Sequence, residues 1–175
     1  IVNERHVDRL IELFKGGGYE SVVTGGTHDR EQRYFAPTVV AGVDPDAPLM
    51  RDEIFGPILP VLTVPDVDSA VQFVNERPHP LALYVFSADE ATAERVIERT
   101  RSGGAAINTT VYHVAIPELP FGGVGPSGIG AYHGEAGFER FSHSRSVLNK
   151  PTRPDPPILY PPHKRWKEAI LRRVL

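Results

Sequence analysis

The sequence predicts an α/β fold in which helices cover a parallel β-sheet. Three apolar runs of strand length follow one another, at 58–64, 81–86 and 104–107. Segments with helical periodicity separate them, at 66–75 and 89–101. Runs that are apolar on both faces are typical of buried parallel strands, and a β-α-β-α-β order with short connections builds such a sheet. We therefore expect the three runs to be adjacent parallel strands with right-handed crossovers.

The residues before this unit predict one helix and two short strands. Residues 3–14 form the helix, with Asn3 as its N-cap and the glycines at 16–18 as its end. Its apolar positions recur at helical spacing: Val7, Leu10, Ile11 and Phe14. Two apolar runs at 21–24 and 34–40, separated by a polar turn, are interpreted as strands.

The helix at 66–75 has Asp66 as its expected cap, and each helix of the α/β unit has one apolar face. The predicted core of this unit comprises Val61, Leu62, Val71, Val74, Leu83, Val85, Val96 and Ile97. Ligands of open parallel sheets bind beyond the carboxyl ends of the strands. The segment after Ile107 is therefore a candidate site.

Composition excludes several classes of protein. The chain has 175 residues, 41% hydrophobic and 23% charged, which is typical of one globular domain. A net charge of −3 predicts no nucleic-acid partner, and the absence of a long apolar run or signal sequence predicts a cytoplasmic protein without a transmembrane segment. With no cysteine, disulfides, thiolate metal sites and a cysteine nucleophile are excluded within the chain.

Glu53 and Phe55 lie two residues apart, directly before the first apolar strand, and Gly56-Pro57 ends the local structure. A carboxylate accepts two hydroxyl donors at once, as a ribose diol offers them. An aromatic ring beside it packs on a planar heterocycle. The alternative is a solvated loop, which the motif alone does not exclude.

A long loop follows the last strand, and loops of this length in compact domains are usually functional. Asn108 ends the strand, where its amide holds a loop backbone or orients a substrate. The run 123–128 spells G-x-G-x-x-G, but it does not connect a first strand to its helix, so we reject a dinucleotide fingerprint. Ser127 does not fit the nucleophile-elbow spacing. The histidines lack metal-ligand spacing, so no metal site is expected.

The end of the chain predicts a helical turn at 138–142, a strand at 144–149, a proline-rich segment at 151–162 and a basic amphipathic helix at 163–175. The apolar stripe of that helix is formed by Trp166, Ile170 and Val174, with Leu171 beside it. The stripe packs on the domain, on a partner subunit or on a membrane surface; peripheral membrane contact is one of the three alternatives.

Together these residues resemble the aldehyde dehydrogenase superfamily, and most closely its class 3 branch, which acts on fatty and aromatic aldehydes. The matching segments are 53–57, 80–87, 108–113, 119–125, 127–128, Gly130, 132–134 and 141–143. The resemblance runs from residue 1 to about residue 151, and Tyr160-Pro161-Pro162 before an amphipathic helix also fits the branch. It implies a three-layer α/β fold of the aldehyde dehydrogenase catalytic-domain type, with an oligomerisation strand and a tail helix.

The resemblance also implies roles for individual residues. The family's glutamate at the position of Glu53 binds the nicotinamide-ribose hydroxyls, and its phenylalanine at the position of Phe55 packs by the nicotinamide. The cofactor is therefore expected to be NAD or NADP. The positions that match the family's aldehyde pocket are Asn108, Val111, Ala115, Phe121 and His133.

In that family a cysteine attacks the aldehyde, hydride passes to NAD(P), and the thioester is hydrolysed. The resemblance places the cysteine, the general-base glutamate, the oxyanion asparagine and the main nucleotide-binding domain upstream of residue 1, so no catalytic residue is expected in this chain. We expect residues 1–143 to be the C-terminal portion of a catalytic domain, 144–150 a dimerisation strand and 151–175 the tail. The chain is then part of a homodimeric aldehyde dehydrogenase and inactive alone; a stand-alone, non-catalytic dimerisation module is the alternative.

Overall fold

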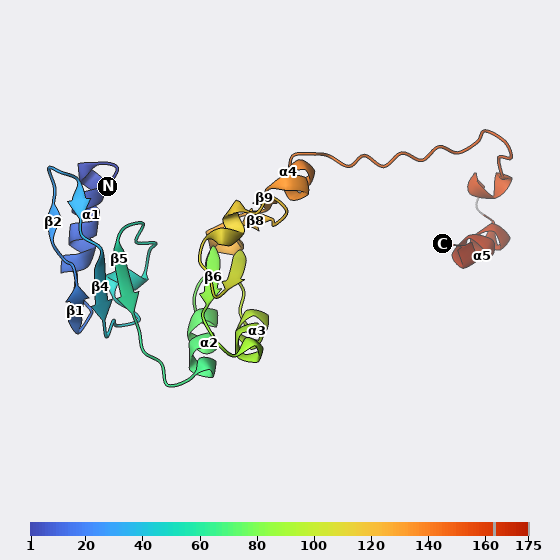
Figure 1. Cartoon of the computed structure of the whole chain (residues 1–175). Coiled ribbons are helices and arrows are strands. Elements are labelled where there is room, and N and C mark those ends of the chain that lie inside the picture. The colour runs from blue at the N-terminus through green and yellow to red at the C-terminus, as the bar shows by residue number, and fades with distance from the viewer. Residues whose placement is uncertain (163, 175) are drawn as a thin grey trace.

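The computed structural model describes residues 1–162 and 164–174, and Figure 1 shows two lobes followed by a tail. The N-terminal lobe, residues 1–64, contains one helix and a sheet with the strand order β1-β4-β5. Its elements are α1 (Glu4–Lys15), β1 (Ser21–Thr24), β2 (His28–Asp29), β3 (Tyr34–Phe35), β4 (Thr38–Ala41), the 3₁₀ turn η1 (Pro48–Met50) and β5 (Ile58–Val61). Strand β4 is antiparallel to β1 and parallel to β5.

Helix α1 begins and packs as its sequence predicts. The Asn3 side chain accepts a hydrogen bond from the His6 amide at 3.0 Å, which satisfies one of the free amides of the first turn. Val7 and Leu10 are fully buried. The core of the lobe is formed by Leu10, Phe35, Val40, Val43, Ala47, Leu49 and Ile58, so α1 is fixed on the sheet and on η1.

The second lobe, residues 66–107, is a β-α-β unit preceded by a helix. It contains α2 (Val67–Asn75), β6 (Ala82–Val85), α3 (Glu90–Arg99) and β7 (Gly104–Ile107). Asp66 caps α2 through the Ser69 amide at 2.7 Å, and this bond to its charged form lowers the pKa of the Asp66 carboxyl. Strands β6 and β7 are parallel and adjacent, which confirms that part of the predicted sheet.

The prediction that β5 lies beside β6 is wrong. Strand β5 pairs with β4, and β6 pairs only with β7, so the two parallel pairs belong to different sheets among the described residues. An apolar run predicts a buried strand but does not say which strand lies next to it. The run predicted at 34–40 is also divided, because Pro37 lacks the amide of a ladder and separates β3 from β4.

The predicted core of the α/β unit is also largely wrong for this chain. Of the eight residues, only Val71 is buried, and Val61 is exposed. The other six are half-buried, and five of them lie in the second lobe, where the unpaired edges and one helix face are not covered. An apolar groove remains open between α2, α3 and β6, lined among others by Val67, Ala70, Val74, Leu83, Val85 and Val96.

After β7 the chain forms a compact loop region. Its elements are the 3₁₀ turn η2 (Tyr112–Ala115), β8 (Phe121–Gly122), the 3₁₀ turn η3 (Gly125–Ser127), β9 (Ala131–Tyr132) and α4 (Gly134–Arg140). Strands β8 and β9 form a small antiparallel ladder. The helical turn predicted at 138–142 therefore begins earlier, at Gly134.

Residues 144–149, predicted as a strand, form no ladder within the described residues and are exposed throughout. They belong to the extended segment that Figure 1 shows between α4 and the tail. The tail contains η4 (Pro157–Leu159) and α5 (Arg165–Val174). Two residues of the predicted tail helix, His163 and Leu175, lie outside the described residues.

The tail is held together by its own side chains. Lys167 is buried and its Nζ donates to the carbonyl oxygens of Pro157 at 2.7 Å and Tyr160 at 2.8 Å. Lys150 and the Tyr160 hydroxyl both donate to Asp155, which lowers the pKa of the Asp155 carboxyl.

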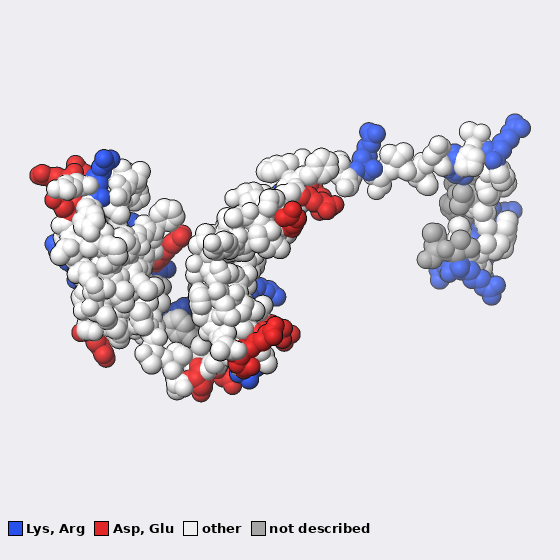
Figure 2. All heavy atoms as spheres, in the orientation of Figure 1, with Lys and Arg blue, Asp and Glu red and all other residues white. Residues whose placement is uncertain are grey.

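Figure 2 shows Lys and Arg side chains gathered on the tail. Lys167 does not contribute to this charged surface, because its amine is turned inward onto η4. The exposed apolar side chains of α5 include Trp166 and Ile170. Of the helices within residues 1–162 and 164–174, none is both long and apolar enough to cross a membrane.

Candidate functional site

The loop that carries Glu53 and Phe55 lies between η1 and β5 and rests on α1. Arg9 of α1 donates to the backbone carbonyls of Glu53 and Ile54. Beneath the loop, Gly56 lies against the side chain of Leu10, and a Cβ at this position would overlap that side chain unless Leu10 moved. The Glu53 side chain is exposed and makes no hydrogen bond or ion pair among the described residues. The Phe55 ring is 82% exposed, so both groups are free to contact a ligand.

Backbone strain coincides with the predicted site. Among the described residues, five that are not glycine have a positive φ: Arg33, Phe55, Asn108, Val111 and His133. All of these except Arg33 are among the site residues predicted from the sequence. A non-glycine residue in this region costs about 1–3 kcal/mol and is found most often where a binding or catalytic geometry requires it. Val111, with φ of 64°, is the most unusual because it is β-branched.

Phe121 and His133 lie together at the β8–β9 ladder. Their rings are stacked, with centroids 5.9 Å apart and an interplanar angle of 24°. Tyr132 packs edge-on against both rings, at 5.7 Å from Phe121 and 4.5 Å from His133. The ladder pairs Phe121 with Tyr132 directly, which explains why residues eleven positions apart meet here.

His113, one of the histidines for which no metal site was expected, packs against this aromatic group. Its ring is 7% exposed and packs edge-on against Tyr84 and Phe121, at 5.7 and 5.9 Å. Neither ring nitrogen has a hydrogen-bond partner among the described residues. Burying unpaired imidazole nitrogens is unfavourable, so the aromatic contacts must hold this ring in place. The sequence offered no signal beyond a histidine after a strand.

The Asn108 amide engages the loop after β6. Its Oδ1 accepts from the Ser87 amide, and its Nδ2 donates to the Ser87 carbonyl, both at 2.9 Å. The side chain thus acts as a clamp between the ends of β6 and β7, which is the loop-holding alternative. Val111, which precedes η2, and Ala115, its last residue, are exposed. Their place in an aldehyde pocket stays a prediction.

The side chain of Ser127 in the glycine-rich loop bonds to the backbone of the same loop. Ser127 Oγ accepts from the Val124 amide at 2.9 Å and donates to the Val124 carbonyl at 3.1 Å. A hydroxyl bound to its own loop in this way closes the η3 turn.

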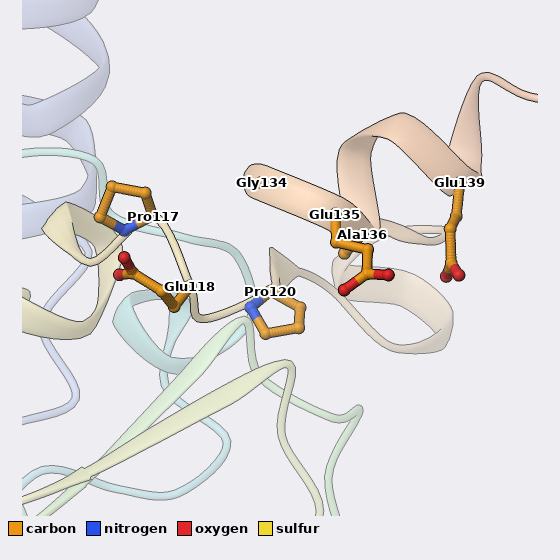
Figure 3. Close-up of a pocket in the computed structure, with 7 residues that line it drawn as sticks. All are labelled: Pro117, Glu118, Pro120, Gly134, Glu135, Ala136 and Glu139. Carbon is orange, nitrogen blue, oxygen red and sulfur yellow. The ribbon is translucent and has the colours of Figure 1, made fainter.

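A cleft lies next to His133, between the loop at 117–120 and the first turns of α4. Figure 3 shows Glu118 on the loop, with Glu135 and Glu139 on α4. These carboxylates make the cleft acidic. Within the part of the chain that the structure describes, no group of three or more His, Asp or Glu side chains is placed to hold a metal ion.

Four of the predicted site residues form two groups, and Asn108, Val111 and Ala115 lie between them in the sequence. Glu53 and Phe55 lie on the N-terminal lobe, and Phe121 and His133 lie at the β8–β9 ladder. No hydrogen bond, ion pair or ring contact between described residues joins the groups. Sequence reasoning also missed Arg9, because its partners are 44 and 45 residues away.

Comparison with known proteins gives the same family for sequence and structure. Residues 1–147 match the model of the aldehyde dehydrogenase family. The mouse protein named "Aldehyde dehydrogenase, dimeric NADP-preferring" is 45% identical over 172 residues, which cover 93% of this chain and 37% of the mouse protein. The substrate-bound structure of Staphylococcus aureus AldH has a TM-score of 0.87 at 44% identity, covering all of this chain and 38% of that one.

The structure of an NAD-dependent aldehyde dehydrogenase from Sinorhizobium meliloti has a TM-score of 0.81 at 36% identity, covering 89% of this chain and 31% of that one. The chain thus spans about a third of the length of these relatives. The family model covers both lobes and the loop region between β7 and α4, which include every predicted site residue. The strained loops described above therefore lie on an α/β fold of known kind, and the chain belongs to the aldehyde dehydrogenase family.

Proposed function

We propose that this chain is part of an NAD(P)-dependent aldehyde dehydrogenase that oxidises an aldehyde to a carboxylic acid. The observation that carries the proposal is the Glu53–Phe55 loop. It presents a free carboxylate and an exposed ring on a backbone held in an unfavourable conformation. The names of the mouse and S. meliloti relatives, one NADP-preferring and one NAD-dependent, support a nicotinamide cofactor of either kind.

In this proposal Glu53 accepts hydrogen bonds from the two ribose hydroxyls, and Phe55 packs on the nicotinamide side. Glu53 and Phe55 fit a nicotinamide nucleotide. The Glu53 carboxylate makes no hydrogen bond or ion pair among the described residues, and the Phe55 ring is exposed. Bound NAD(P) supplies the acceptor for the hydride of the aldehyde carbon. The chain's own part is to hold the ribose and orient the ring, which brings reacting atoms into position.

The second group forms a wall for the aldehyde. Phe121 and His133 offer a stacked aromatic surface, and we propose that Val111, Ala115 and Asn108 complete it. Such a wall suits apolar aldehydes, because aromatic and aliphatic surface is removed from water when the substrate binds.

The nucleophile and the general base come, in this proposal, from a segment upstream of residue 1. A thiolate there attacks the carbonyl carbon, the hydride leaves that carbon, and water activated by the base releases the acid from the thioester. The chain itself has no cysteine, so it cannot form the thioester. We further propose the finer architecture expected above, namely a three-layer sheet completed by other segments and a homodimer in which residues 144–149 add to a partner sheet.

The test is a nicotinamide-absorbance assay on the full-length protein and on the 175-residue chain, with a medium-chain and an aromatic aldehyde. The full-length protein should turn over and the chain should not. Glu53→Gln should lower kcat/KM for the cofactor about ten- to a hundredfold, because it removes hydrogen bonds to a charged acceptor. Glu31→Gln, at an exposed turn, is the matched control.

Turnover by the 175-residue chain would contradict the proposed division of the site. An unchanged rate in Glu53→Gln would remove the ribose-binding role. A chain that folds and dimerises alone without binding nucleotide would instead favour the non-catalytic module.

A further inference from the structure

The backbone of the Glu53–Gly56 loop has almost no support of its own. Within the described residues, none of the amides at 53–56 donates a backbone hydrogen bond, and none of the carbonyls there accepts one. The two carbonyls at the start of this loop, those of Glu53 and Ile54, accept only from Arg9. The side chain of Ile54 packs against the core of the lobe, but the hydrogen bonds that hold the loop backbone come from one side chain of α1.

We propose that Arg9 is the positioning residue of the cofactor loop, and that it acts through the backbone of Glu53 and Ile54 rather than by touching the reacting atoms. This inference rests on the cofactor role proposed for Glu53 and Phe55. Arg9 Nη2 donates to the Ile54 carbonyl, and Nη1 makes a longer contact of 3.5 Å with the Glu53 carbonyl. Both carbonyls therefore face one guanidinium, which is planar and keeps its donors in fixed directions. An ammonium is a point donor and cannot fix both carbonyls in the same way.

Helix α1 is a firm base for this contact. Leu10, the next residue along the helix, is fully buried and packs under Gly56 of the same loop. Arg9 and Leu10 thus hold the loop from one turn of one helix, with a polar and an apolar contact. Because α1 is capped at Asn3 and packed in the core of its lobe, the helix that carries Arg9 has a fixed place beside the loop.

The strained backbone of Phe55 indicates what the hydrogen bonds of Arg9 stabilise. Phe55 has φ of 45°, and rotation of the Ile54–Phe55 peptide would relieve this conformation. Such a rotation turns the Ile54 carbonyl away from the place where Arg9 holds it. Arg9 therefore selects the strained arrangement, in which the Phe55 ring is presented to solvent and Glu53 stands beside it.

The experiment compares Arg9→Met, Arg9→Lys and Arg5→Met in the full-length protein. Arg5 lies on the same helix, is exposed and makes no described hydrogen bond, so it controls for loss of a charge on α1. Dissociation constants of NADH and NADPH are measured by nicotinamide fluorescence, together with kcat, the KM of the aldehyde and the unfolding midpoint. Arg9→Met should weaken nucleotide binding about tenfold, Arg9→Lys about threefold, and Arg5→Met not at all.

The KM of the aldehyde should change little, because Arg9 acts only on the cofactor side. The double variant Arg9→Met, Glu53→Gln should lose less nucleotide affinity than the sum of the two single losses, since residues that act through one another are not additive. Amide hydrogen exchange at 53–56 should be faster in Arg9→Met and intermediate in Arg9→Lys. If Arg9→Met does not fold, the graded effect of Arg9→Lys and its exchange at 53–56 carry the test.

Additive effects of the two substitutions, or equal losses in Arg9→Met and Arg5→Met, would overturn the positioning role. Wild-type protein that binds no nucleotide would overturn the proposed function and this inference together. If Glu53→Gln loses nucleotide binding while Arg9→Met and Arg9→Lys keep it, the positioning role of Arg9 is wrong and the proposed cofactor role of Glu53 stands.

Discussion

At the scale of single residues, Gly104 decides where His113 lies. A Cβ on Gly104 would be 2.9 Å from both Cδ2 and Nε2 of the His113 ring. That ring in turn packs against Phe121, the residue stacked on His133. Gly104 is therefore required because a side chain at this position would overlap the His113 ring, and not because the backbone turns there. A larger residue would displace His113 and, through it, Phe121 of the proposed aldehyde wall.

We predict that Gly104→Ala destabilises the full-length protein by about 1–3 kcal/mol, because it overpacks the site of a ring that has no room to move. Urea unfolding measures the loss, with Ala105→Ser on the exposed side of the same strand as control. In a His113→Ala background the cost of Gly104→Ala should shrink, with a coupling of about 0.5–3 kcal/mol. Equal costs in both backgrounds would show that the histidine is not what the new methyl group meets.

At the scale of elements, the segment after α4 is extended but pairs with no strand among the described residues. Residues 144–149 are extended and exposed, and Leu148 is 92% exposed. Apolar side chains on an extended backbone with free amides and carbonyls are typical of a strand that adds to another sheet. The dimerisation strand proposed above would use these groups.

We predict that Leu148→Pro shifts the full-length protein from dimer towards monomer, because proline removes a ladder amide and disfavours a central strand position. Leu148→Ala keeps the amide and serves as the control for the lost side chain. Sedimentation velocity across a concentration series measures the shift. A dimer that tolerates proline as well as alanine would place the interface elsewhere.

At the scale of the whole chain, the second lobe is incompletely covered. Only Val71 and Ala93 of its apolar residues are buried, and the groove between α2, α3 and β6 is open. Strands β5, β6 and β7 each have one unpaired edge among the described residues. Open edges and exposed apolar grooves favour association, and a lobe with so few buried side chains has little to stabilise it alone.

We therefore predict that the isolated 175-residue chain enhances the fluorescence of anilinonaphthalene sulfonate and self-associates, while the full-length protein does neither to a comparable extent. Val96→Asp in the isolated chain should reduce dye binding, because it places a charge in the groove. Arg101→Asp, at an exposed position just after α3, is the control. A dye-silent, monomeric chain would mean that the groove closes without other segments.

What the sequence predicted well depends on contacts between near neighbours. The cap of α1 at Asn3, the cap of α2 at Asp66 and the bounds of β1 and β7 follow from local spacing, and the structure confirms them. The pairing of β5 was wrong because a strand's neighbour is set by segments far away. The burial predicted for Val61 failed for the same reason.

The candidate site shows the same limit. Glu53 and Phe55 were found from a motif five residues long, and Phe121 and His133 from a resemblance. Arg9 could not be found this way, because neither spacing nor residue type connects it to a loop 44 residues on. The place of His113 in the aromatic cluster was missed because a histidine with unpaired nitrogens in such a cluster has no sequence signature.

The packing of Leu10 under Gly56 has a consequence that reaches beyond the loop. If docking of α1 favours the loop conformation that binds nucleotide, then nucleotide must favour docking of α1 by the same free energy. The stability of the first helix would then depend on whether nucleotide is bound to the loop that this helix supports. Its resistance to proteases would rise and fall with the supply of cofactor, and so would the lifetime of the protein in the cell.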